Sequence, residues 1–317
     1  MAGPVSDLVR LDGEDPEVLL ARAESLKARP SLKARVLGIF GGSLDSCERL
    51  QAASEAYEQA ARVFLMRNLK LQARSAYVRS AETQLEARDC DAFVDRTFAD
   101  KRIARQYAHA AACCAEDSLD DACGHVNQAV SYFSRAGDFS AAMREMQTVA
   151  ERYTKANQPQ AAIARYTQAL KLCELHSTQS SSGNSLEYGR RHLFLEMARL
   201  HIATNAYRGA LDVYLSLLDR AAESHILRLD ISDFAVHAAL CFMLMEDEVG
   251  LEQCGAITEA LNPMDDTFIR GITGAISAGD LDAFEAAVQA NRSLRIKPAP
   301  TLQSLLAQLR QRVGSIA

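Results

Sequence analysis

The sequence predicts an all-α fold built of paired helices. The 317-residue chain holds only 7 Pro and 16 Gly, and it is rich in the helix formers Ala, Leu, Arg, Gln and Glu. A short phrase of small and aromatic residues recurs along the chain, as in repeat proteins. Between its copies apolar residues repeat at helical spacing, and no alternating strand pattern is found.

The recurring phrase sets a small residue, an aromatic or aliphatic residue four positions on, and then another small residue. It reads AASEAYEQAARVF at 52–64, DACGHVNQAVSYF at 121–133, AAIARYTQALKLC at 161–173 and RGALDVYLSL at 208–217. On a helix these positions share one face, where small residues let a neighbouring helix approach and the ring fills the groove beside them. Repeated helix pairs of about 34–40 residues predict a tetratricopeptide-like right-handed helical-hairpin solenoid.

Partner helices are predicted between the copies at about 140–155 and 186–204, where apolar residues form one stripe. Pro159 stands near a helix start, where its missing N–H costs nothing. The polar, serine-rich run at 176–185 is predicted to be a flexible loop.

The repeat fades beyond Asp230, although helical spacing continues. Five further helices are predicted at about 231–246, 248–261, 265–278, 281–292 and 301–313. We therefore assign residues 1–229 to the solenoid and residues 230–317 to a C-terminal helical bundle that closes it.

Composition narrows the classes of function. The net charge of −6 argues against a mainly nucleic-acid-binding protein. No apolar run reaches the roughly 18 residues that a membrane span needs, and the opening residues do not read as a secretory signal. Without an export signal, the eight cysteines are expected to stay reduced.

Charge is spread unevenly along the chain. From 230 to 290 there are twelve acidic residues against one basic residue, Arg270, whereas from 101 to 228 basic residues slightly outnumber acidic ones. This polarity suits two different partners at two places, and ordinary solvated faces are the alternative.

The sequence contains no convincing catalytic motif. The glycine-rich run GIFGGS at 38–43 follows a predicted helix and lacks a Lys-Ser/Thr ending, so it is not a phosphate-binding loop. Cys114, Cys123 and His125 lack a second well-spaced Cys/His pair and are interpreted as core thiols and a surface His. We therefore predict no enzyme activity, no metal and no cofactor.

An apolar stretch bounded by glycines, at 36–42, stands between two predicted helices. Its large apolar residues are Val36, Leu37, Ile39 and Phe40. Such a loop is either tucked into the core or exposed for a partner. With four basic residues just upstream, it would give weak, reversible attachment to anionic lipid.

Three phrases together resemble the alpha-SNAP family of soluble NSF attachment proteins. GIFGGS with the following CERLQAASEAYEQAARVF resembles the family's N-terminal region. AGDFSAAMREMQTVAERY resembles its mid-solenoid helix-turn-helix, and FAVHAALCFMLMED resembles the helix entering its C-terminal bundle. The likeness runs in the same order from about residue 16 to residue 313. It implies an adaptor that binds assembled SNARE complexes (syntaxin-type bundles) and presents an acidic end to the NSF ATPase for SNARE disassembly in vesicular transport and membrane fusion.

The resemblance also implies which residues contact each partner. The family's SNARE-facing basic positions fall on Arg144, Arg191 (or His192) and Arg228. Its membrane-contacting loop falls on Val36, Leu37, Ile39 and Phe40. The expected NSF contact comprises three acidic residues and one apolar residue close to the end of the chain: Asp280, Asp282, Glu285 and Ile316.

The chain departs from the family at several matching positions. Glu196 and Asp138 stand where the family has basic residues, and Ser277 and Ala278 stand where it has an acidic pair. The expected charge match to a SNARE bundle is therefore partly preserved.

The resemblance implies a cytoplasmic protein that is peripheral on membranes. It would be a monomer alone, with several copies on one SNARE bundle. Two alternatives stay open: a generic tetratricopeptide scaffold that holds a short peptide in its concave groove, and an adaptor of the gamma-SNAP type with a different cargo. The first would need Asn and Lys/Arg residues converging on a carboxylate, and the inner helices show no such repeated arrangement.

Overall fold

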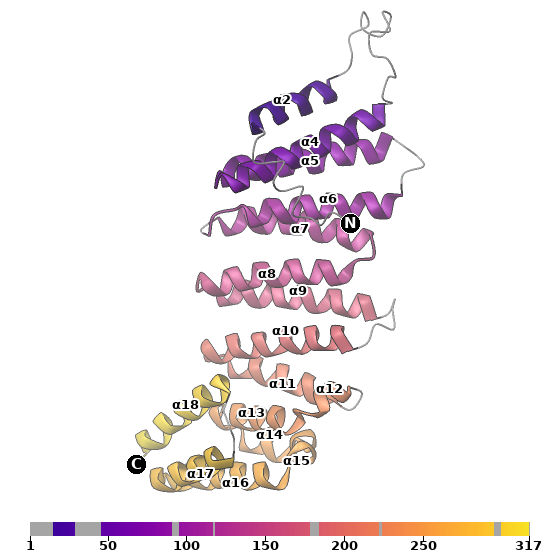
Figure 1. Cartoon of the computed structure of the whole chain (residues 1–317). Helices are drawn as coiled ribbons and strands as arrows, with labels where there is room; N and C mark the ends of the chain where they lie inside the picture. Colours follow the sequence, from indigo (N-terminus) through magenta and orange to yellow (C-terminus); the bar gives the residue numbers. More distant parts are fainter. Residues whose placement is uncertain are drawn as a thin grey trace, which may run out of the picture. The chain divides into compact units, whose positions relative to one another are not determined.

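The computed structural model describes residues 15–28, 46–90, 95–116, 118–177, 184–221, 224–294 and 299–316 (Figure 1). Within these residues all regular secondary structure is helical, in sixteen helices that pair through short connections. The predicted all-α fold of tetratricopeptide-like helical hairpins is therefore confirmed. The chain divides into two compact units, Met1–Gln179 and Ser180–Ala317. The boundary assigned from the sequence, at 229/230, falls inside the second unit and stays a prediction.

Successive helices of the first unit pack against one another. Their bounds are α2 (Pro16–Lys27), α4 (Ser46–Met66), α5 (Lys70–Cys90), α6 (Arg96–Ala112), α7 (Leu119–Arg135), α8 (Phe139–Lys155) and α9 (Pro159–Ser177). The closest pairs are α4 with α5, α6 with α7, and α8 with α9, and the hairpins stack through α5 on α6 and α7 on α8 (Figure 1). Packing between neighbours in sequence is the pattern of a solenoid.

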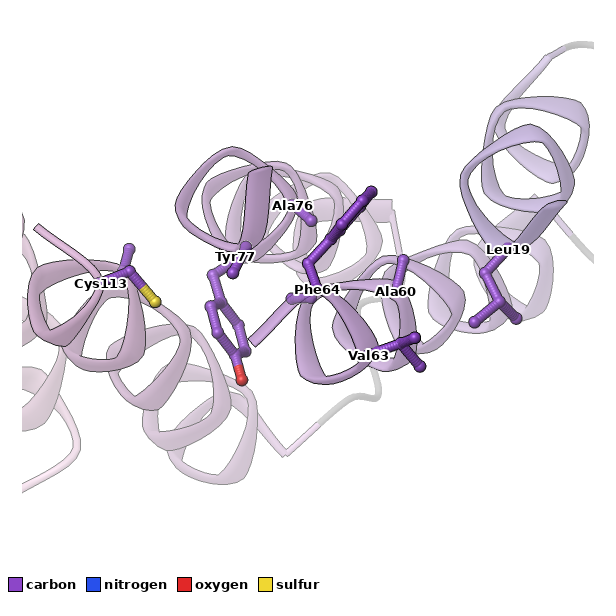
Figure 2. Close-up of a cluster of buried hydrophobic side chains, with 10 residues drawn as sticks. Leu19, Ala60, Val63, Phe64, Ala76, Tyr77 and Cys113 are labelled. Atoms are coloured by element: carbon purple, nitrogen blue, oxygen red, sulfur yellow. The ribbon is translucent and has the colours of Figure 1, made fainter. Parts of the chain in front are cut away.

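The aromatic residue of the recurring phrase is buried wherever it is a tyrosine. Tyr57, Tyr166 and Tyr214 are only 2%, 1% and 1% exposed. Figure 2 shows a neighbouring cluster in which Phe64 and Tyr77 lie among small side chains such as Ala60 and Ala76. A buried ring contributes a large apolar area, and alanine leaves room for the next helix, so the phrase forms core rather than a ligand site.

The same tight turn follows six helices of the described chain: α4, α7, α8, α10, α13 and α16. The turn residue has a positive φ, between 56° and 70°, at Asn68, Gly137, Asn157, Asn205, Glu246 and Gly279. In each turn the following backbone N–H donates to a carbonyl five residues back, as from Leu69 N to Phe64 O at 2.8 Å. Five of the six turn residues are Asn or Gly, which adopt this left-handed conformation at least cost, so they end one helix and set the direction of the next.

Helix α13 forms the centre of the second unit. The unit contains α10 (Asn184–Ala203), α11 (Tyr207–Ala221), α12 (His225–Arg228), α13 (Ile231–Leu244), α14 (Glu248–Gln253), α15 (Gly255–Ala260), α16 (Pro263–Ala278), α17 (Leu281–Leu294) and α18 (Pro300–Ile316). All ten residues from Phe234 to Met243 are buried. Helices α11, α15, α16 and α18 pack around α13, as an apolar helix in a core requires.

One predicted helix of this unit is wrong in part. The helix expected at 248–261 is two short helices, α14 and α15, because the backbone at Cys254 leaves the helical region (φ −81°, ψ 83°).

No helix among the described residues is both long enough and apolar enough to cross a bilayer.

The expectation that every cysteine stays reduced is also wrong, because Cys47 and Cys90 form a disulfide. Cys47 is the second residue of α4 and Cys90 is the last of α5, so the bond closes the open end of this hairpin. Their Cα atoms lie 5.8 Å apart, a usual separation for a disulfide. Of the other six cysteines five are buried, and Cys254 is half-buried.

We predict that reducing this bond destabilises the first unit. The disulfide closes a loop across 43 residues of sequence, and losing such a bond costs about 2–4 kcal/mol of unfolding free energy. Thermal unfolding followed by circular dichroism should show a lower Tm with dithiothreitol, and in Cys47→Ser without it. Cys254→Ser is the matched control and should keep the sensitivity to dithiothreitol. Equal Tm values with and without reductant would contradict the prediction.

Candidate functional site

The first candidate basic residue, Arg144, lies on the exposed face of α8. The other face of this helix is buried through Met146, Val149 and Tyr153 at helical spacing. No described residue forms an ion pair or hydrogen bond with the Arg144 guanidinium. Burial raises the pKa of the adjacent Glu145, and the positive charge of Arg144 opposes that rise. Arg144 therefore offers an exposed cation, with no hydrogen bond or ion pair among the described residues, to an acidic partner.

The acidic residue that replaces a family basic position, Asp138, has a structural role at the start of the same helix. Its Oδ1 accepts a hydrogen bond from the backbone N–H of Ala141 at 3.2 Å, which caps α8. Its Oδ2 also lies 3.7 Å from Nζ of Lys101 on α6. A carboxylate here stabilises the helix start, which gives a local reason for an acidic residue at this position.

The two candidate cations of the second unit, Arg191 and Arg228, lie around one turn. Nη2 of Arg191 on α10 lies 2.5 Å from Oδ2 of Asp230, the residue before α13. Arg228 is exposed at the end of α12, beside Leu229, which is 75% exposed. Arg191 is thus already paired within the unit, and an acidic partner must compete with Asp230 for it.

The three candidate acidic residues around the start of α17 differ in what they contact. Oδ1 of Asp280 accepts from the backbone N–H of Ala283 at 2.9 Å, so Asp280 caps α17. Glu285 forms an ion pair with Arg310 of α18. Asp282 is exposed and has no ion-pair partner among the described residues. Of the three, Asp282 is the most available to a basic partner.

Sequence reasoning singled out none of the acidic residues around a small hollow in the same unit. The hollow has a volume of about 80 Å³. Its lining combines acidic and apolar side chains: Met243, Glu246, Glu248, Leu251, Glu252, Thr273, Ile276 and Arg312. Arg312 donates to the carbonyl oxygen of Met243 at 2.9 Å and forms an ion pair with Glu246. These residues come from four helices and a turn, so only the acidic composition of 230–290 marked them in advance.

Some candidate residues lie outside what the structure describes. The apolar loop residues Val36, Leu37, Ile39 and Phe40 fall in the undescribed segment 29–45. Ile316 is the last residue of α18, and its side chain is not described. Their assignments stay predictions.

Among the described residues, no three His, Cys, Asp or Glu side chains are placed to hold a metal ion. Near Cys114 and His125, Nη1 of Arg74 donates to Oδ2 of Asp121 at 2.8 Å. Burial lowers the pKa of His125, the charge of Arg74 lowers it further, and Asp121 opposes the shift. The charged groups of this neighbourhood form an ion pair between α5 and α7.

Comparison with known proteins places these features in one family. Residues 14–296 match the sequence model of the family described as "Soluble NSF attachment protein, SNAP". The human "Alpha-soluble NSF attachment protein" is 24% identical over 239 residues, 74% of this chain and 72% of the relative. The bovine "Beta-soluble NSF attachment protein" is 23% identical over 240 residues, with the same shares of each chain.

More distant similarities extend beyond animals and to solved structures. The "Probable vesicular-fusion protein sec17 homolog" of Neurospora crassa is 23% identical over 237 residues, 74% of this chain and 73% of the relative. BtubC from P. vanneervenii is similar over 82% of this chain and 93% of its own, at 16% identity and a TM-score of 0.34. The TPR domain of P58(IPK) is similar over 96% and 99%, at 12% identity and a TM-score of 0.25.

Proposed function

The chain belongs to the family of soluble NSF attachment proteins, and we propose that it is an adaptor that binds assembled SNARE complexes and recruits the NSF ATPase to take them apart. The match to the family over residues 14–296 carries this proposal. The adaptor supplies no bond chemistry of its own. It holds an acidic helical bundle through exposed cations and offers an acidic end to the ATPase.

The charges on the structure support this division of roles. Arg144 is exposed on α8, and Arg228 is exposed at the end of α12. In the second unit, Glu248, Glu252 and Asp282 are exposed within the acidic block. Surfaces of opposite sign steer different partners to different places, and the effect weakens as salt screens the charges.

Single contacts of this kind are modest, so the proposal includes several copies on one bundle. Exposed ion pairs contribute about 0.2–1 kcal/mol each. Several copies, together with weak attachment of the loop at 36–40 to the membrane, raise the effective concentration of each contact. We therefore propose a cytoplasmic protein that acts as a peripheral membrane protein during SNARE disassembly.

Reversing two candidate cations should weaken SNARE binding. We expect Arg144→Glu with Arg228→Glu to lower affinity for a preassembled bundle about 10-fold or more at low salt, because two attractive contacts become repulsive. Affinity is measured by sedimentation or fluorescence titration at two salt concentrations. The control, Arg96→Glu with Lys171→Glu, makes the same charge change at two other exposed residues of α6 and α9 and should bind normally. Unchanged binding by the folded test variant would refute these assignments.

The loop should matter only where a membrane is present. We expect Ile39→Ser with Phe40→Ser to slow disassembly of SNARE complexes embedded in liposomes, because apolar insertion is lost. Disassembly of soluble SNARE bundles and the far-ultraviolet circular dichroism should stay as in the parent. A Tm well below that of the parent would instead show that the loop is part of the core.

Reversing the acidic candidates should abolish NSF recruitment while SNARE binding remains. The test variant carries Asp280→Lys, Asp282→Lys and Glu285→Lys, and recruitment is measured by pull-down on immobilised SNARE bundle. Asp282→Lys alone is a milder variant that breaks no ion pair or hydrogen bond among the described residues, and it should slow association at low salt. Asp219→Lys, an exposed position of α11, is its matched control.

Two results would count against this assignment. Normal NSF recruitment by the triple variant would move the ATPase contact elsewhere. Deleting residues 315–317 tests the role of Ile316 separately, and ATP hydrolysis that is stimulated as in the parent would remove that residue from the contact.

A further inference from the structure

A hollow in the first unit, between α4 and α6, has features that the proposed function does not use. Its volume is about 250 Å³. Basic, polar and aromatic side chains line it: Glu58, Arg62, Phe98, Arg102, Arg105, Gln106 and His109. The residues project from two neighbouring hairpins, and none is among the candidates for SNARE, membrane or NSF contact.

The guanidinium groups around this hollow outnumber the carboxylates that pair with them. Arg62 forms an ion pair with Glu58 one turn earlier on α4. Nη2 of Arg102 lies 3.4 Å from Oε1 of Glu55. Arg105 is exposed, and no described residue pairs with it. The hollow therefore carries about one positive charge in excess.

The side chain of His109 does not add to this excess at neutral pH. Desolvation is the main cause that lowers its pKa from the usual value near 6.5. Glu58 opposes the shift, and the positive charges of Arg62 and Arg105 add to it. The ring is therefore mostly neutral at pH 7.

A buried carbonyl in the hollow lacks a hydrogen-bond donor. Gln106 is only 4% exposed, and its Nε2 donates to Oε2 of Glu58 at 2.7 Å. Because a carboxylate can only accept, this bond fixes which end of the amide carries the oxygen. That oxygen, Oε1, is buried and has no hydrogen-bond partner among the described residues. An unsatisfied buried acceptor costs about 1–3 kcal/mol, so a donor that reached it would bind favourably.

An exposed ring adds an apolar surface to the same hollow. Phe98 lies in the first turn of α6, where its backbone N–H donates to the N-cap carboxylate of Asp95. Its side chain is 59% exposed, although the residue is large and apolar. A partner that covers this ring would gain from removing it from water.

We propose that this hollow binds an acidic peptide segment of a partner protein. One carboxylate of the segment pairs with Arg105, an apolar neighbour covers Phe98, and a peptide N–H donates to Oε1 of Gln106 after a small movement of that buried side chain. A single excess charge matches a carboxylate better than a phosphate dianion, and guanidinium groups bind carboxylates through paired hydrogen bonds. The site does not depend on the proposed function, since it uses different residues.

The test uses the full chain, labelled with ¹⁵N, and two short peptides. Acetyl-Leu-Asp-Leu-amide carries the carboxylate, and acetyl-Leu-Asn-Leu-amide is its uncharged isostere. The Asp peptide should shift the side-chain amide resonances of Gln106 in a saturable titration. The Asn peptide should bind at least about 10-fold more weakly, because the charge-assisted contact is lost.

Variants at the protein side complete the experiment. Arg105→Glu should weaken binding of the Asp peptide at least about 10-fold, and Arg105→Gln should weaken it less. Neither variant breaks a hydrogen bond or ion pair among the described residues, so the fold should persist. Arg96→Glu, on the same helix and outside the hollow, should bind as the parent does. Equal affinity for both peptides, full affinity in Arg105→Glu, or no shift at Gln106 would each overturn the proposal.

Discussion

Close packing of helices over alanine is the constraint on which the rest of this structure depends. In α9, Ala162 and Ala169 are fully buried on either side of Tyr166. In α11, Ala210 and Tyr214 repeat the arrangement. A small residue lets the partner helix approach, and the ring fills the remaining space at the density of a protein interior. A larger residue at an alanine position would force the helices apart and disturb every face that they present.

The left-handed turns fix the direction of consecutive helices and therefore the positions of the charged side chains that those helices carry. Asn68, Gly137, Asn157 and Asn205 end their helices with the same left-handed conformation, which sets how the next helix leaves the turn. Many of those charged side chains are then used within the unit. Asp138 and Asp280 cap helices, and other charges form ion pairs between helices. The charged side chains that form no cap or ion pair within their unit remain available to a partner.

The positions of the helices could be predicted from the sequence because the patterns that mark a helix extend over only a few residues. The helix expected at 140–155 is found at Phe139–Lys155, and that expected at 186–204 at Asn184–Ala203, since apolar periodicity and turn residues act over a few positions. The break at Cys254 was missed although Gly255, a residue unfavourable inside a helix, directly follows it. The disulfide between Cys47 and Cys90 was missed because nothing in a spacing of 43 residues marks a pair.

The candidate sites were less predictable, because their contacts join separate helices. The sequence singles out Arg191 as a cation, but only the fold brings Asp230 to it. Likewise, the excess charge beside Gln106 arises where α4 meets α6. The account's central claim, that the chain links a SNARE bundle to NSF, is tested most directly by one measurement: pull-down on an immobilised, preassembled SNARE bundle, with NSF added in the presence or absence of this chain. The account predicts that the chain binds the bundle alone and that NSF is retained only when the chain is present. Failure of the chain to bind, or equal retention of NSF without it, would contradict the account.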